Sequence, residues 1–137
     1  MSGEWAKHGL TPTNYEVWIG YVAGYLDGEG CFGTDSKGRI FVSVSNTYPK
    51  TLLDLKTAFG GSVAKKSDQV RNRTAWYWRV HGDNALAVCS HVVPFLKEKR
   101  EQAMILMDIY SFPARSAMRA GLVSRLKELK RIDYGRF

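Results

Sequence analysis

Apolar and polar residues alternate along two parts of the chain, and this period of two predicts two β-hairpins. The first hairpin comprises the segments Cys31–Asp35 and Arg39–Ser45, joined by a tight turn at residues 36–38. The second comprises Ser62–Lys66 and Ala75–His81, joined by a polar loop. Because each hairpin has one apolar face, we expect a sheet that buries one face and leaves the other open.

Helix signals precede the first hairpin. An apolar stretch at Asn14–Leu26 follows Thr13, and Glu16 lies three residues after that threonine, which is the pattern of a capping box. Thr11-Pro12, just upstream, is a competing start because proline favours the first turn of a helix. The helix is expected to end in the glycines that follow Leu26.

Further helices are predicted after each hairpin. Pro49–Phe59 is amphipathic and is followed by two glycines, with an apolar side made of Leu52, Leu53, Leu55 and Phe59. Asp83 can cap a helix that ends near Pro94. Two more helices are expected at Phe95–Tyr110 and Ser116–Lys130.

The order of these elements is α-β-β-α-β-β-α followed by further helices, which predicts an α+β fold built on a four-stranded antiparallel sheet. The 137 residues, with 45% hydrophobic and 12% aromatic content, are typical of one folded domain. We expect residues 1–12 to be a loosely ordered N-terminal extension. No apolar run is long enough to span a membrane, so an intracellular, soluble protein without a membrane partner is predicted.

The positive charge of the chain is concentrated in the predicted hairpins. The formal net charge is +7, and nine basic residues against three acidic ones lie between Gly30 and Gly82. Such a local excess is typical of a protein that binds a polyanion such as nucleic acid. The two cysteines are too few for a disulfide framework, and their spacing does not indicate zinc.

The segment WIGYVAGYLDGEGCF, residues 18–32, places three glycines at four-residue spacing. In a helix Gly20, Gly24 and Gly28 form a stripe without side chains, which lets a second helix approach closely. Two such helices would bring two Glu29 carboxylates together, and a divalent cation between them would offset the repulsion. The alternative is a tightly packed core helix with no partner.

Residues 22–30, VAGYLDGEG, resemble the nine-residue signature of the LAGLIDADG homing endonucleases. Ala, Gly, Asp and Gly match at their positions, and Glu29 stands in for the last aspartate. The resemblance implies a sheet that forms a saddle over double-stranded DNA. A single motif in a chain of this length resembles the homodimeric enzymes, which are encoded within introns or inteins. The dimer interface implied by the motif comprises Gly20, Tyr21, Gly24, Tyr25, Asp27 and Gly28.

The open faces of the predicted strands carry the candidate DNA contacts. Side chains of mixed chemistry there can read base edges in a major groove, which admits a two-stranded ribbon. These positions are Gly33, Asp35, Lys37, Arg39, Phe41, Ser43, Ser45, Lys66, Tyr77, Arg79 and His81. Lys65, Arg71 and Arg73 in the second hairpin are better placed for phosphates. Asp35 either accepts a hydrogen bond from cytosine or caps the turn.

The resemblance also implies the residues of a metal-dependent phosphodiester hydrolase. Glu29 matches the family's metal-binding acid, and the Gly28 carbonyl is a second candidate ligand for Mg²⁺. Asn46 lies where relatives hold a water near the metals, although asparagine also commonly initiates a turn. Lys97 matches the position of a catalytic lysine, with Lys99 as the alternative. The position of Asp27 resembles one that supports the helix ends more than the chemistry.

The function implied is a site-specific double-strand break in a long, roughly palindromic DNA site, made by a homodimer with Mg²⁺ and no small-molecule substrate. The main alternative is a DNA- or RNA-binding protein on the same scaffold that does not cut, such as an intron maturase or a regulator. Glu29 favours the enzyme, because inactive relatives tend to lose this acid.

Overall fold

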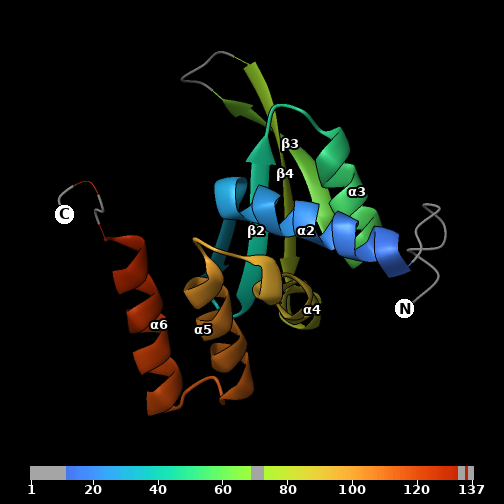
Figure 1. Cartoon of the computed structure of the whole chain (residues 1–137). Helices are drawn as coiled ribbons and strands as arrows, with labels where there is room; N and C mark the ends of the chain where they lie inside the picture. Colours follow the sequence, from blue (N-terminus) through green and yellow to red (C-terminus); the bar gives the residue numbers. More distant parts are fainter. Residues whose placement is uncertain (1–11, 69–72, 133–134, 136–137) are drawn as a thin grey trace.

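The computed structural model describes residues 12–68, 73–132 and 135. Helices flank and follow two hairpins in the predicted order (Figure 1). The elements are α2 (Pro12–Glu29), β1 (Gly30–Thr34), β2 (Ile40–Asn46), α3 (Lys50–Phe59), β3 (Ser62–Asp68), β4 (Arg73–His81), α4 (Gly82–Val92), the 3₁₀ helix η1 (Val93–Phe95), α5 (Arg100–Ser111) and α6 (Ala117–Lys130). The predicted N-terminal extension, apart from Pro12, lies outside the described residues.

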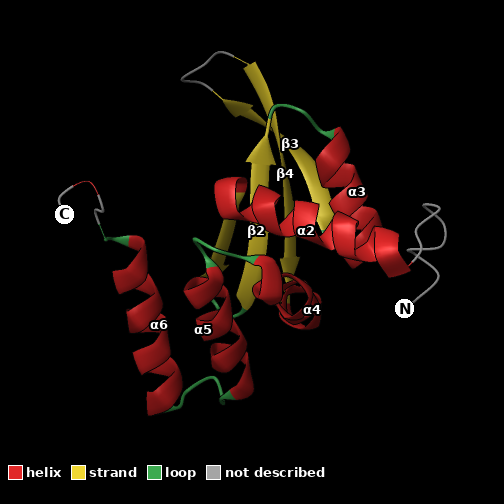
Figure 2. Ribbon diagram, viewed as in Figure 1, coloured by secondary structure: helices red, strands yellow, loops and turns green. Residues whose placement is uncertain are grey.

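The four strands form one antiparallel sheet in the order β1-β2-β4-β3. This confirms the predicted α+β class and the two hairpins. Because β2 pairs with β4, the hairpins join through the strands that lie second and third along the sheet. Figure 2 shows α2 crossing in front of the sheet, and α2, α3 and α4 all contact its strands. The opposite face carries exposed or half-buried residues such as Cys31, Ser45 and Tyr77.

The core lies between the sheet and these helices. Phe32, Ile40, Val42, Val44, Trp78 and Val80 project from the covered face and are almost fully buried. Burial of each such side chain contributes about 1.5–3 kcal/mol to folding. The indole nitrogen of Trp78 donates to the Gly60 carbonyl at 2.9 Å, so the largest core side chain leaves no polar atom unpaired there.

The first helix is longer than predicted at both ends. It begins at Pro12, so the proline start is correct, and the capping box at Thr13 is wrong because Thr13 lies inside the helix. It continues through Gly28 to Glu29 and meets β1 directly at Gly30. A Cβ at Gly30 would lie 2.8 Å from the Leu26 carbonyl oxygen. The glycine is therefore needed for the strand to begin this close to the helix.

Three other predictions about the helices were wrong. Asp83 does not cap α4, because His81 is the N-cap and Asp83 lies in the first turn. Leu53 is exposed and not part of the apolar side of α3. The helix predicted at Phe95–Tyr110 begins only at Arg100, because η1 ends at Phe95 and the backbone is extended at Leu96. This last difference places both candidate lysines, Lys97 and Lys99, in a loop.

The C-terminal helices extend the fold beyond the sheet. Helix α5 packs against β1 and β2, and α6 packs against α5 (Figure 1). Ser116 caps α6 by accepting a hydrogen bond from the Arg119 amide at 3.1 Å. The Arg119 guanidinium donates to the carbonyls of Phe112 and Gly38, which ties the start of α6 to the first hairpin. None of the helices in the described part of the chain is long and apolar enough to cross a membrane.

Candidate nucleic-acid interface and acidic helix end

The uncovered face of the sheet, here called the open face, carries most of the predicted DNA contacts. The strand register arranges them in rows across the sheet. One row contains Gly33, Phe41 and His81, the next Cys31, Ser43, Arg79 and Ser62, and the third Ser45, Tyr77 and Ala64. Lys66 pairs with Ala75 farther toward the tip of the second hairpin. The structure therefore brings together positions that lie up to about fifty residues apart in the sequence.

The basic residues at the tip of the second hairpin do not share one face. Arg73 follows the parity of the open-face positions of β4. Lys65 pairs opposite Trp76 and lies on the covered face, where its ammonium sits 5.3 Å from the centre of the Trp76 ring. Arg71 lies outside the described residues. Only part of the predicted phosphate-binding set is thus on the open face.

Asp35 organises the turn of the first hairpin. One carboxylate oxygen accepts from the backbone amides of Lys37 and Arg39, each at 2.9 Å. The other accepts from Arg39 Nε at 2.9 Å and lies 3.5 Å from His81 Nε2. Desolvation acts to raise the pKa of Asp35, but the hydrogen bonds from Arg39 and Lys37 outweigh it and the pKa is lowered. Of the two roles considered for Asp35, the structure contains the turn cap.

His81 stands beside this turn on the open face. Burial lowers its pKa, the positive charges of Arg39 and Arg79 lower it further, and the attraction of Asp35 only partly opposes them. The imidazole is therefore neutral near pH 7, with one nitrogen able to donate and the other to accept. A neutral ring on this face can pair with a base edge without adding charge.

Glu29 ends α2 at the surface. Glu29 and the neighbouring Gly28 are exposed, and the Glu29 carboxylate forms no hydrogen bond or ion pair with residues 12–68, 73–132 or 135. A carboxylate and a carbonyl oxygen are the hard ligands that Mg²⁺ prefers. These two donors fit a divalent cation, but no group of three or more His, Cys, Asp or Glu side chains able to hold a metal occurs among the described residues.

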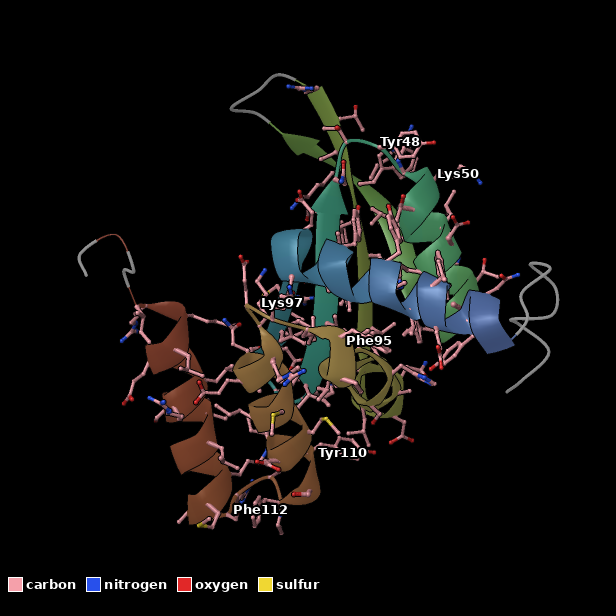
Figure 3. All side chains as sticks on the ribbon, viewed as in Figure 1. Tyr48, Lys50, Phe95, Lys97, Tyr110 and Phe112 are labelled. Carbon is pink, nitrogen blue, oxygen red and sulfur yellow. The ribbon has the colours of Figure 1, made fainter. Side chains whose placement is uncertain are left out.

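Asp27 joins the end of α2 to the loop between η1 and α5. Its two carboxylate oxygens accept from the backbone amides of Lys97, at 2.8 Å, and Lys99, at 3.0 Å. The Lys99 ammonium donates to the Gly30 carbonyl at 2.6 Å, one residue beyond Glu29. Lys97 is exposed on the same loop (Figure 3). Both candidate lysines therefore lie at the end of α2 that carries Asp27 and Glu29, called the acidic helix end below. Of the two, Lys99 is the one whose ammonium contacts the backbone there.

Asn46 ends β2 close to the same helix. Its Nδ2 donates to the Tyr25 hydroxyl at 3.0 Å, and its Oδ1 accepts from the Tyr48 amide at 3.1 Å. Burial raises the pKa of Tyr25, the Asn46 hydrogen bond lowers it, and the nearby charge of Glu29 raises it again. Asn46 thus initiates the turn after β2, as its alternative role predicted, and also links that turn to α2 near Glu29.

Among residues 12–68, 73–132 and 135, nothing packs on one side of α2 at its glycines. Gly20, Gly24 and Gly28 have no atoms within 4 Å of where a side chain would begin. Val17 is 71% exposed and Tyr21 is 54% exposed beside them, while Ile19, Val22, Ala23 and Leu26 on the opposite side are buried. A helix that is apolar all round is expected to be buried on both sides. This side, defined by Val17, Gly20, Tyr21, Gly24 and Gly28, is called the glycine ridge below.

A shallow groove next to Lys97 and Lys99 was missed by the sequence analysis. It has a volume of about 640 Å³ and is lined by Lys97, Glu98, Lys99, Gln102, Leu129, Lys130 and Ile132. The Lys130 ammonium reaches back to the sheet and lies 3.6 Å from the Cys31 sulfur. Nothing local in the sequence relates Lys130 to β1, so this contact could not be predicted. The only signal in the sequence was that the α6 segment ends in basic residues.

The structure is similar to those of homing endonucleases. With I-CvuI in complex with its target in the presence of Ca, the TM-score is 0.73 at 19% sequence identity, covering 89% of this chain and 87% of that chain. A second I-CvuI complex, with the I-CreI target, Mg and uncleaved DNA, gives 0.71 at 19% identity, covering 88% and 86%. With the archaeal intron-encoded I-Vdi141I complexed with DNA, the score is 0.69 at 15% identity, covering 87% of each chain.

No protein-family model and no curated protein matches the sequence. The likeness to these solved structures covers 87–89% of this chain. This chain therefore has the fold of the homing endonucleases, as the resemblance of residues 22–30 predicted.

Proposed function

We propose that this protein is a site-specific DNA endonuclease that cuts both strands of a long, roughly palindromic site as a homodimer. The observation that carries the proposal is the end of α2. There an exposed Glu29 carboxylate, unpaired within the described part of the chain, lies beside a lysine-bearing loop, at one edge of an open sheet face rich in hydrogen-bonding side chains. The solved structures with this fold, I-CvuI and I-Vdi141I, are complexes with DNA.

Binding to DNA is supported by shape and charge. The open face is made of two hairpins, and a major groove admits a two-stranded ribbon such as a hairpin. The net charge of +7 would double in a dimer, and counterion release from the phosphates would then contribute much of the affinity. We therefore expect binding that weakens steeply as salt is raised.

Cleavage would depend on residues that meet at the acidic helix end. Glu29 and the Gly28 carbonyl would hold Mg²⁺, which when bound activates water and offsets charge at the scissile phosphate. Lys99 is proposed as the lysine that stabilises the developing charge, because its ammonium lies at the Gly30 carbonyl next to Glu29. Asn46 would support the site through Tyr25, and Lys97 would contact the DNA backbone.

A second copy of the chain is the proposed occupant of the glycine ridge. Two ridges in contact would bury Val17 and Tyr21, and the absence of side chains at Gly20, Gly24 and Gly28 lets two helix backbones approach closely. The two Glu29 residues would then lie near each other, one for each DNA strand. Gly24→Leu should abolish the dimer, because the leucine side chain would hold the two helices apart. The fold of each chain should tolerate the change, because a Cβ at Gly24 meets no atom within 4 Å.

The control for the dimer is Gly121→Leu on α6, where a side chain also meets nothing within the chain. Sedimentation of both variants measures their mass in solution. A Gly24→Leu protein that remains dimeric, or a wild-type protein that is monomeric when saturated with its DNA site, contradicts the proposed interface.

The cleavage proposal is tested by selecting cut sites from a randomised or genomic DNA library with Mg²⁺, using wild type and Glu29→Gln. Wild type should cut one discrete long site, and Glu29→Gln should bind that site with cutting lost. Asp108→Asn, at an exposed acid on α5, is the control and should cut normally. A wild-type protein that binds one site and never cuts it would instead support the maturase or regulator alternative.

A further inference from the structure

The open face contains a buried aromatic ring. Phe41 is 8% exposed, and the register places it on the open face between Gly33 and His81. A Cβ at Gly33 would lie 2.8 Å from Cζ of Phe41, so the ring occupies the space that a side chain at position 33 would need. The Phe41 ring therefore lies over Gly33 of β1, in space that only a glycine leaves open.

The Arg79 guanidinium lies over this ring. The centre of its guanidinium lies 3.9 Å from the centroid of the Phe41 ring, which is the geometry of a cation–π contact. Such a contact uses the planar face of the guanidinium and leaves the N–H groups at its edge free. The Arg79 guanidinium forms no hydrogen bond or ion pair with the part of the chain that the structure describes.

The surroundings of Arg79 leave that edge accessible. Its cross-strand neighbours are Ser43 on β2 and Ser62 on β3, both small. Asp35, in the adjoining turn, is already paired with Arg39 and lies against His81. Asp35 therefore does not draw the Arg79 guanidinium away from its place over the ring.

From this arrangement, and resting on the proposed function, we infer that Arg79 reads a guanine in each half of the DNA site, with Phe41 and Gly33 as its positioning residues. A guanidinium edge offers only donors, and guanine presents two acceptors, O6 and N7, in the major groove. Adenine presents one acceptor beside a donor, so it pairs less well.

A phosphate could also accept two hydrogen bonds from an arginine, but the position of Arg79 disfavours this partner. Strand β4 is an interior strand of the order β1-β2-β4-β3. A ribbon lying in a groove presents its centre to the base edges and its margins to the phosphates. A pre-stacked guanidinium in the centre also loses little rotamer freedom on binding, which favours discrimination between bases.

The experiment is a binding selection from a randomised DNA library without added divalent metal, so that cutting does not enter. Wild type is compared with Arg79→Gln, Phe41→Leu and Gly33→Ala. We expect guanine to be fixed at one position of each half-site for wild type. Arg79→Gln should reduce the preference for that guanine about tenfold to a hundredfold and leave the other positions unchanged.

Phe41→Leu and Gly33→Ala should relax the same single position, because each removes or displaces the ring that seats Arg79. Both variants keep the Arg79 side chain. A general effect on folding would instead lower the sequence preference at all positions of the site together. Arg73→Gln, an exposed arginine on the same strand, is the matched control and should lower affinity without changing the selected sequence. Melting temperatures of the variants show that each is folded.

Two results would overturn the inference, and they are distinguishable from each other. If wild type selects a discrete site but Arg79→Gln lowers affinity equally at every position, Arg79 contacts a phosphate and the proposed endonuclease function still stands. If wild type selects no discrete site, the site-specific function itself fails and the inference fails with it.

Discussion

Two aspartates in this protein hold two basic loops by the same chemistry but over different distances. Asp35 accepts hydrogen bonds from the amides of Lys37 and Arg39, two and four residues along the chain. Asp27 accepts from the amides of Lys97 and Lys99, seventy and seventy-two residues away. In each case one carboxylate satisfies two amides that lie two residues apart, and basic side chains are presented beside it.

The difference lies in what each loop depends on. The Asp35 turn is held by neighbours in sequence. The Gly38 backbone N–H donates a hydrogen bond to the Asp35 carbonyl, and Gly38 has a positive φ of 78°. The loop that contains Lys97 and Lys99 is ordered from the end of α2, two residues before Glu29. A change in Asp35 should therefore act locally, whereas a change in Asp27 should reach the proposed cleavage site.

The largest expected effect separates the two lysines that Asp27 positions. Lys99→Met should lower the cleavage rate at saturating DNA about a hundredfold, because it removes a positive charge next to Glu29 while keeping the length of the side chain. Lys97→Met should mainly weaken DNA binding, by less than about tenfold, because an exposed lysine acts as a phosphate contact. Single-turnover cleavage and equilibrium binding measure the two quantities.

Equal losses of rate in both lysine variants would contradict this division of roles. A larger loss for Lys97→Met would reverse it, and Lys97, the position that the sequence resemblance favoured, would then be the lysine closer to the chemistry.

The second prediction concerns Asp27 itself. Asp27→Ala leaves the Lys97 and Lys99 amides without their acceptor, and it should lower the free energy of unfolding by about 1–3 kcal/mol. Cleavage should fall about tenfold as the loop moves away from Glu29. Asp27→Asn keeps one acceptor oxygen and should lie between wild type and alanine in both measurements.

Glu98→Gln provides the matched control for that loop, because Glu98 is exposed and forms no hydrogen bond or ion pair within the described ranges. Its free energy of unfolding should stay within about 0.5 kcal/mol of wild type. If Asp27→Ala destabilises the protein no more than Glu98→Gln does, the loop is not ordered from α2, and the contrast with Asp35 disappears.

The same contrast explains how much could be predicted from the sequence. The hairpins, the sheet class and the order of the helices were predicted correctly, because alternation and helix signals are local properties of the chain. The Asp35 turn was also within reach, since aspartate commonly accepts from amides two residues on. The extent of α2 was underestimated, because its last turn is fixed by the packing of Gly30 against Leu26 and not by local preference.

Long-range features of the candidate site could not be predicted in the same way. Helix propensity continued the α5 segment back to Phe95, but the Asp27 carboxylate holds Lys97 and Lys99 in a loop instead. The burial of Phe41 depends on pairing with Gly33 and on Arg79 from another hairpin. Glu29 and the glycine ridge were identified from the motif, and their roles remain proposals.

The smallest expected effect concerns Asp35 and depends on pH. The pKa of Asp35 in the folded protein lies below its ordinary value of 3.8, so its carboxylate stabilises the fold above that value, and this contribution is lost as the pH falls through the lower folded pKa. Asp35→Asn should therefore be less stable than wild type at pH 7, by less than about 1 kcal/mol because the site is at the surface.

The difference between wild type and Asp35→Asn should be constant from pH 7 to about pH 5 and shrink as the pH falls below about 4, because both proteins then carry an uncharged group at position 35. Urea unfolding at a series of pH values measures it. Lys37→Ala is the control, because Lys37 contributes its backbone amide and the substitution keeps that donor. A wild-type advantage that persists unchanged to pH 2 would mean that the charge of Asp35 does not hold the turn. Asp35 and Asp27 would then have in common only that each accepts hydrogen bonds from two backbone amides.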